Sequence, residues 1–207
     1  MLSHFLSAFV TLFVVIDPPG CAPIFAGLTG GASARQRRGM ALRSTFIAAL
    51  ILFAFALIGE PLLKVLGISL DAFRIAGGIM LFLIALEMVF EKRTQKREER
   101  ASKVAHSPEP VEDISVFPMA MPMIAGPGSI ASAMLLMGRS HGLTEHATVL
   151  AALGAVLMLM VLALLAAGTI MRAVGPRVEG VITRLLGVLL AALAAQYVVD
   201  GVGGAFR

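Results

Sequence analysis

Apolar residues run along this chain in six long blocks, separated by shorter polar stretches. Each block is close to the roughly 20 apolar residues that a helix needs to cross a bilayer. The blocks are continuous runs of Ala, Leu, Ile and Met rather than the alternating pattern of membrane strands. The pattern therefore predicts six transmembrane helices, at about residues 2–28, 39–59, 68–90, 114–138, 146–171 and 178–199.

The composition excludes the other broad classes of protein. Of 207 residues, 58% are hydrophobic and 14% are charged, whereas soluble domains average about 25% charged residues. The chain is too apolar to be disordered, and it has no Trp and only 6% aromatic residues, which argues against a β-barrel. One cysteine, Cys21, excludes internal disulfides and a Cys-based metal site, and we expect no metal or cofactor.

The basic residues predict the orientation in the membrane. Of 17 Lys and Arg residues, 13 fall on one side of the six predicted spans. Cytoplasmic loops carry the excess of basic residues, so this side is predicted to be cytoplasmic, with both termini outside. The net charge of +4 is then explained by loops facing the cytoplasm rather than by nucleic-acid binding. The four basic residues on the outer side are Lys64, Arg74, Arg139 and Arg207.

Two short motifs occur twice at nearly the same offset. Residues 16–20 and 124–128 both read I-x-x-P-G, 108 residues apart. Residues 74–77 and 184–187 read R-I-A-G and R-L-L-G, 110 residues apart. The chain is thus predicted to repeat a three-helix unit, and an odd number of spans per unit inserts the copies with opposite topology. We expect an all-α membrane protein of two inverted repeats, residues 1–90 and 113–207, joined by a cytoplasmic linker at 91–112.

The Pro-Gly motifs predict breaks in the first and fourth helices. Proline removes a backbone hydrogen bond inside a helix, and the half-helix that follows begins with free N–H groups at its positive dipole end. Such ends bind carboxylate or phosphate. The substrate-binding residues predicted at the two breaks are Asp17, Pro19, Gly20, Cys21, Gly126, Pro127, Gly128 and Ser129.

Asp17 is the sharpest single candidate, since an ionisable group deep in an apolar span is costly and usually functional. Its carboxylate could bind a substrate ammonium, a coupling cation or a proton, or it could cap the following half-helix; both roles are compatible. Asp200 is interpreted as an interfacial acid near a span end, and Glu87, four residues before the charged loop, is either interfacial or functional. Arg74 and Arg184 have either an anchoring or a functional role, which the sequence leaves open.

The sixth block also predicts close helix packing. Gly187, Ala191 and Ala195 recur every four residues, and small residues at this spacing let helices approach closely. Gln196 and Tyr197 follow in the same block and can form hydrogen bonds with another helix.

The runs VVIDPPGCAPIFAGLT, RIAGGIMLF and PMAMPMIAGPGSIASAM, with the length and six-span layout, resemble the MarC family of inner-membrane proteins. The resemblance covers essentially the whole chain. It implies a relation to the LysE transporter superfamily and, from members described as neutral amino acid transporters, amino acid translocation. The motif positions carried over by the resemblance are Asp17, Pro18, Pro19, Gly20, Pro23, Gly126, Pro127, Gly128 and Ser129.

The sequence thus predicts a secondary transporter of the bacterial inner membrane that moves small solutes, most of all neutral amino acids. No ATP-binding motif is found, so the energy would come from a gradient of H⁺ or Na⁺, with Asp17 as the ion ligand. An intramembrane enzyme is not expected, because Asp17, Ser129 and Cys21 lack a base. The alternatives are a non-transporting membrane subunit and an export protein for another small metabolite or drug. The oligomeric state is left open.

Overall fold

In this computed structural model the described residues are 2–90, 92, 95, 99 and 113–206, with only the backbone described for 170–179. Most of the predicted linker at 91–112 lies outside them. The described elements are helical: α1 (Leu2–Ile16), α2 (Pro18–Leu28), α3 (Ala34–Val65), α4 (Leu70–Val89), η1 (Ser115–Ile124), α6 (Pro127–Arg139), α7 (Gly142–Leu165) and α8 (Ala167–Ala205).

The helices match the predicted membrane spans in character, and in number if one bent pair is counted as a span. Within the part of the chain that the structure describes, five stretches are long and apolar enough to cross a bilayer, at Leu2–Leu28, Ala34–Val65, Leu70–Val89, Gly142–Leu165 and Gly180–Ala205. The pair η1 and α6 forms a sixth if the two are counted as one span, bent by 52°. The prediction of an all-helical membrane protein with a broken fourth segment is therefore confirmed.

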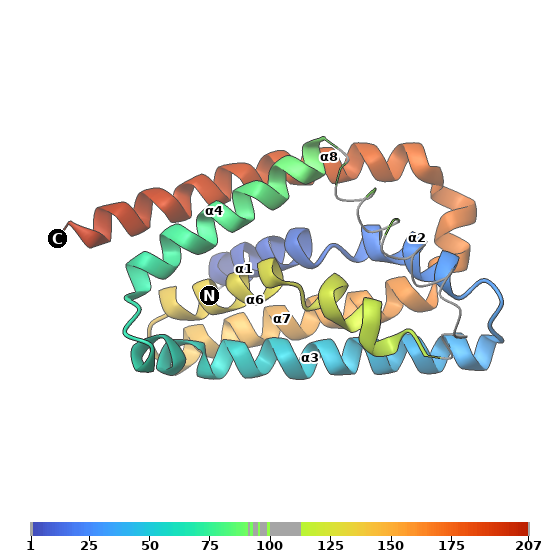
Figure 1. The fold of residues 1–207 in the computed structure, drawn as a ribbon, viewed down its shortest axis with the longest axis horizontal. Helices are drawn as coiled ribbons and strands as arrows, with labels where there is room; N and C mark the ends of the chain where they lie inside the picture. The colour runs from blue at the N-terminus through green and yellow to red at the C-terminus, as the bar shows by residue number, and fades with distance from the viewer. Residues whose placement is uncertain (1, 91, 93–94, 96–98, 100–112, 207) are drawn as a thin grey trace.

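Two helix boundaries differ from those predicted. Helix α3 begins at Ala34 because Ser33 and Gln36 form a capping box: Ser33 Oγ accepts from the Gln36 N–H and Gln36 Oε1 from the Ser33 N–H. The predicted span at 146–171 is interrupted, since α7 ends at Leu165 and α8 begins at Ala167. Figure 1 shows α8 first crossing the end of the bundle and then returning along it.

The helices form three layers (Figure 1). Helices α4 and α8 lie together on one side, and α3 and α7 lie on the other. Between them are the short helices, of which α1, α2 and α6 each contact both outer layers. One apolar cluster joins the middle layer to α3 and α7, and a second lies between α4 and α8 and includes Val14, Val15 and Leu135 of the middle layer. The broken helices are thus enclosed by unbroken ones.

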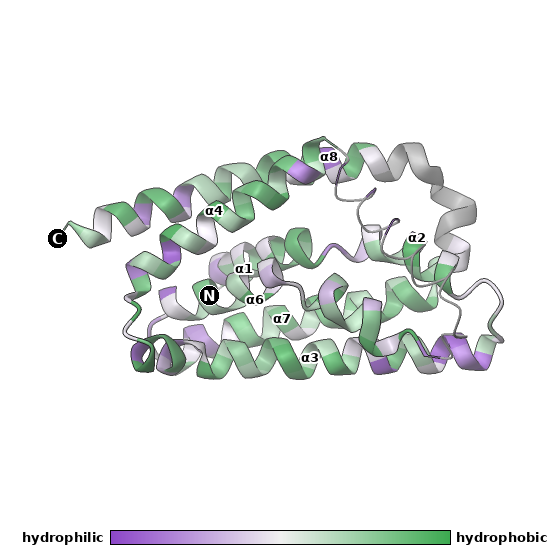
Figure 2. Ribbon diagram, viewed as in Figure 1, coloured by the Kyte–Doolittle hydropathy of each residue, from purple (hydrophilic) through white to green (hydrophobic). Residues whose placement is uncertain are grey.

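The outer surfaces are strongly apolar, as a lipid-facing surface must be. On α3 the side chains of Phe46, Leu50 and Leu57 are all more than half exposed. The same holds on α8 for Val181, Leu185, Val188 and Leu189. Figure 2 shows these helices as largely hydrophobic, with a hydrophilic stretch at the start of α3. Exposed apolar area on this scale indicates a membrane environment.

Helices α4 and α8 pack antiparallel through glycines. A Cβ on Gly78 would lie 2.9 Å from the Ala194 carbonyl oxygen and 3.1 Å from Cβ of Tyr197. A Cβ on Gly187 would lie 3.1 Å from the Ala85 carbonyl oxygen and 2.9 Å from Cβ of Met88. The interface on α8 is a stripe with spacings of three and four residues, at Gly187, Leu190, Ala194, Tyr197 and Gly201. Of the predicted stripe of every fourth residue, Gly187 and the half-buried Ala191 do pack in this interface, whereas the prediction was wrong for Ala195, which is exposed.

The described chain begins and ends at one end of the bundle. His4 Nδ1 lies 4.0 Å from Glu145 at the start of α7. At the other terminus, Gly204 packs directly against the carboxylate of Asp71 at the start of α4. The basic start of α3 lies at the opposite end (Figure 2).

Candidate functional site at the paired helix breaks

The first break separates α1 from α2 at Asp17. The Asp17 N–H donates to the Phe13 carbonyl at 2.9 Å and closes α1. Pro18 and Pro19 have no N–H, so they cannot continue the helical ladder onto the carbonyls of the last turn of α1. Asp17 takes a left-handed conformation, with φ 59° and ψ 64°, which Asp tolerates better than most residues. The break therefore gathers backbone carbonyls beside a carboxylate.

Asp17 also caps α2. Its side chain accepts a hydrogen bond from the Gly20 N–H at 3.1 Å, and its carbonyl accepts one from the Cys21 N–H at 3.1 Å. The capping role considered from the sequence is confirmed. Pro18 and Pro19 have no N–H, and the N–H groups of Gly20 and Cys21 both donate to Asp17. The N–H groups at the start of α2 are therefore engaged.

The second break lies at Ala125 and Gly126. The Ala125 N–H donates back to the Ala120 carbonyl at 2.9 Å, and α6 begins at Pro127. Gly126 is needed here because a Cβ would lie 2.5 Å from the Pro122 carbonyl oxygen. Within η1 the backbone is extended at Phe117 and Met121, and the peptide bonds before Pro118 and Pro122 are cis.

The start of α6 differs from that of α2, because no side chain of the described residues caps it. The first hydrogen bond into the helix runs from the Ile130 N–H to the Gly126 carbonyl at 3.0 Å. Pro127 has no N–H, so the donors at the positive end of α6 are the N–H groups of Gly128 and Ser129. This end of the helix is suited to an anionic group.

The two breaks come together through Gly128. A Cβ there would lie 3.5 Å from Cγ1 of Val15, two residues before Asp17, and would collide with Cδ1 of Ile84 on α4. The carboxylate and carbonyl groups of the first break and the N–H groups of the second thus belong to neighbouring parts of the middle layer. This arrangement suits a small molecule that carries both charges.

Most of the predicted site residues are buried. Asp17, Gly20, Cys21, Gly126, Gly128 and Ser129 are buried, Pro19 is half-buried and Pro127 is exposed. The Cys21 thiol points back to the Ile16 carbonyl, with Sγ 3.7 Å from the oxygen. Pro127 therefore contributes by starting α6, not by facing the site.

Ser132 was not among the site residues predicted from the sequence. It follows Ser129 by three residues on α6, is fully buried, and its hydroxyl has no hydrogen-bond partner among the described residues. A buried hydroxyl without a partner is costly, at about 1–3 kcal/mol, which marks it as a candidate ligand group. The sequence signal was present in the spacing of the two serines, since residues three apart share a helix face.

An ion pair fixes the start of η1 against α3. Arg43 Nη1 lies 2.6 Å from Asp113 Oδ2, and the Ser115 N–H donates to Asp113 Oδ1 at 2.9 Å. Hydrogen bonding from Ser115, assisted by the Arg43 charge, holds the pKa of Asp113 below its ordinary value, although partial burial opposes this. Asp113 therefore stays ionised at neutral pH and anchors the chain where it re-enters the bundle.

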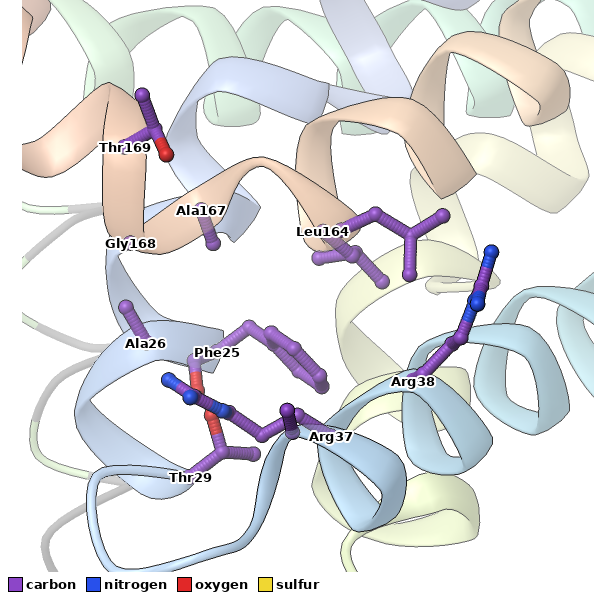
Figure 3. A pocket seen from close by; sticks show the side chains of 11 residues that line it. Phe25, Ala26, Thr29, Arg37, Arg38, Leu164, Ala167, Gly168 and Thr169 are labelled. Carbon is purple, nitrogen blue, oxygen red and sulfur yellow. The ribbon is translucent and has the colours of Figure 1, made fainter.

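A cavity of about 410 Å³ lies at the basic end of the molecule, where α2, α3 and the α7–α8 junction meet (Figure 3). Phe25 and Thr29, from the last turn of α2 and the residue after it, line it, so the same short helix joins the first break to this cavity. Arg37 and Arg38 lie on opposite sides of it, Arg37 beside Thr29 and Arg38 near Leu164.

Comparison with known proteins places this sequence in one family. The family model described as "MarC family integral membrane protein" matches residues 2–206. A UPF0056 membrane protein of Methanocaldococcus jannaschii is 37% identical over 204 residues, which cover 99% of this chain and 98% of that relative. The UPF0056 membrane protein YvbG of Bacillus subtilis is 35% identical over 206 residues, covering 100% and 97%. YhcE of Escherichia coli is 31% identical, covering 96% and 91%. No solved structure matches the chain.

Proposed function

The chain belongs to the MarC family of integral membrane proteins, and we propose that it is a secondary transporter of the bacterial inner membrane. Its substrates are small zwitterions, above all neutral amino acids, and an ion gradient drives their movement. The observation that carries this proposal is the pairing of two helix breaks of opposite polarity between the layers of the bundle.

The chemistry of the two breaks matches the two charges of an amino acid. The end of α1 and the carboxylate of Asp17 offer negative charge, which suits an ammonium group or a coupling cation. The uncapped start of α6 offers the N–H groups of Gly128 and Ser129, which suit a carboxylate. Discontinuous helices in transporters use their ends in this way, with N-termini toward anionic groups and carbonyl ends toward cations. From the sequence alone, the substrate carboxylate could bind the N–H groups at the start of either α2 or α6. Because the N–H groups of α2 are already engaged, we place the carboxylate at the start of α6.

The packing of α4 on α8 supports the inverted repeat that we propose for this transporter. Gly78 approaches Ala194 and Tyr197, and Gly187 approaches Ala85 and Met88. These two contacts are reciprocal, because Gly78, Ala85 and Met88 correspond to residues 109 positions later in the chain. Reciprocal contacts of this kind are what a two-fold axis between the helices produces.

Three further pairs of contacts between elements fit the same exchange. If α1 corresponds to η1, α2 to α6, α3 to α7 and α4 to α8, then the packing of α1 on α7 has its counterpart in η1 on α3. Likewise α2 on α8 corresponds to α6 on α4, and α2 on α7 to α6 on α3. Two halves related in this way can rock against each other around a fixed central site, as alternating access requires.

The inverted topology can be tested by cysteine labelling. Gly31, between α2 and α3, and Leu143, at the start of α7, are exposed and lie at corresponding connections of the two halves. In a Cys21→Ser background, Leu143→Cys is expected to react with an impermeant maleimide in intact cells, and Gly31→Cys only after permeabilisation. Labelling of both positions from the same side would contradict the inverted arrangement.

The transport activity can be tested with purified protein in liposomes. Vesicles preloaded with an unlabelled neutral amino acid are expected to accumulate the labelled form by counterflow, and a pH or Na⁺ gradient should drive net uptake. Protein-free liposomes give the background rate. If no neutral amino acid exchanges above background while the protein is folded and inserted, the proposed substrate class is wrong.

A further inference from the structure

A second group of charged residues lies far from the helix breaks, at the end of the bundle that holds both termini. Arg139, at the end of α6, forms an ion pair with Asp200 near the end of α8. Gln196 Nε2 donates to the other carboxylate oxygen of Asp200 at 2.7 Å. The Arg139 guanidinium also stacks over the ring of Tyr197, with Cζ 4.7 Å from the ring centroid. Two residues of one face of α8, Asp200 and Tyr197, therefore hold Arg139, and Gln196 in turn holds Asp200.

Arg139 lines two cavities. The first, of about 530 Å³, lies between the start of α4 and the ends of α6 and α8, and is also lined by Arg74, His141 and Asp200. The second, of about 390 Å³, is lined by Tyr197, by polar residues of α1 and by the apolar side chains of Leu136, Val149 and Leu193. One side of the Arg139 cluster is thus polar and the other has an apolar wall.

Two buried donors in this cluster lack acceptors. The Tyr197 hydroxyl and the Nε–H of Arg74 are buried, and neither has a hydrogen-bond partner among the described residues. Each residue lines one of the two cavities. Natural proteins rarely leave buried donors unpaired. Unpaired donors on two sides of Arg139 therefore indicate a site for a ligand that carries a hydrogen-bond acceptor.

We propose that these cavities form an outer vestibule that binds a zwitterionic amino acid with an apolar side chain before it reaches the helix breaks. The carboxylate takes the place of Asp200 at Arg139 and accepts from the Tyr197 hydroxyl. The ammonium takes the place of Arg139 at Asp200, and the side chain packs on the apolar wall of the second cavity. This inference rests on the proposed transport function and names a second site for the same class of substrate.

The Arg139–Asp200 pair should make this vestibule select zwitterions over ligands with a single charge. A zwitterion that opens the Arg139–Asp200 pair supplies a partner to each residue, so no charge is left unpaired. A plain carboxylate would leave Asp200 without its cation, and a plain amine would leave Arg139 without its anion. Leaving one member of a partly buried pair alone is strongly unfavourable, so both singly charged analogues should bind much more weakly than the amino acid.

The test is equilibrium binding of labelled L-leucine to detergent-purified Asp17→Asn protein, in which the charge at the central site is removed. We expect saturable binding that 4-methylpentanoate and 3-methylbutylamine, which each lack one charge, displace at least about tenfold less well than L-leucine. Arg139→Gln should abolish this binding. Lys64→Gln is the matched control, because Lys64 pairs with Glu60 at 2.8 Å on an exposed face, and it should bind as before.

Tyr197→Phe separates ligand binding from packing. Loss of a hydrogen bond to a charged group should weaken L-leucine binding by roughly tenfold or more. A purely structural Tyr197 predicts the opposite, namely unchanged binding and a higher Tm, since the substitution removes an unpaired hydroxyl. Unchanged L-leucine affinity in Tyr197→Phe, or the absence of binding to folded Asp17→Asn protein, would overturn the vestibule. Either result leaves counterflow by the wild-type protein untouched, so it is distinct from a failure of the transport proposal.

Discussion

Asp17→Asn is expected to abolish gradient-driven uptake while the protein still folds and inserts. Asn keeps the shape of Asp, caps a helix about as well and tolerates the left-handed conformation seen at φ 59°. Only the charge is lost. A charge-assisted contact is worth about 1.5–3 kcal/mol, so substrate or coupling-ion affinity should fall roughly ten- to a hundredfold. Uptake into liposomes and thermal unfolding of the same preparation measure the two effects.

Two further variants at this position separate charge from structure. Asp17→Gly retains the backbone freedom and loses the side chain, and a Gly cap costs only a few tenths of a kcal/mol relative to Asp. Asp17→Ala loses the cap, at about 1 kcal/mol, and also pays for a left-handed backbone. We therefore expect stability to fall in the order Asn, Gly, Ala, with transport lost in all three. Wild-type uptake by a well-expressed Asp17→Asn variant across a pH series would show that the carboxylate only caps α2.

The two helix breaks could be predicted from sequence because their causes are local. Pro18 and Pro19 remove two consecutive donors, and Gly126 permits a close backbone contact, whatever the rest of the fold does. The apolar helices were likewise predictable, since the bilayer sets the length of each apolar block. In contrast, the end of α7 at Leu165 has no local signal, because the residues on both sides of it are apolar.

The Arg139 cluster could not be predicted from sequence, because the contacts that form it join residues far apart in the chain. Arg139 and Asp200 are 61 residues apart and belong to different helices, so neither carries a local motif. Asp200 was interpreted as an interfacial acid, and Arg139 was only counted as a basic residue of the outer side. The repeat offset shows the same limit: the motifs align Gly77 with Gly187, whereas the helix packing relates Gly78 to Gly187. Register between helices depends on contacts that a linear motif does not contain.

Gly128→Ala is expected to lower both stability and transport, and Gly128→Val to do so more severely. A Cβ at this position would collide with Cδ1 of Ile84, and overpacking of a filled interior costs about 1–3 kcal/mol. Either the Ile84 side chain or the start of α6 would have to shift to relieve this contact. A shift of α6 would displace the N–H groups of Gly128 and Ser129, which we propose bind the substrate carboxylate. Thermal unfolding in detergent and uptake into liposomes measure the two losses. Gly154→Ala is the control, because the nearest atom to a Cβ there is 4.0 Å away.

A second substitution determines which neighbour of Gly128 matters. Ile84→Val deletes only Cδ1, the atom that the new Cβ would meet, and by itself costs about 0.5–1.5 kcal/mol. If the contact with α4 sets the position of α6, the double variant Gly128→Ala with Ile84→Val should regain most of the stability and transport lost by Gly128→Ala alone. A double variant that regains its Tm but stays inactive would instead show that the added methyl group blocks the ligand directly. The interface with α4 would then hold the fold together without setting the geometry of the site.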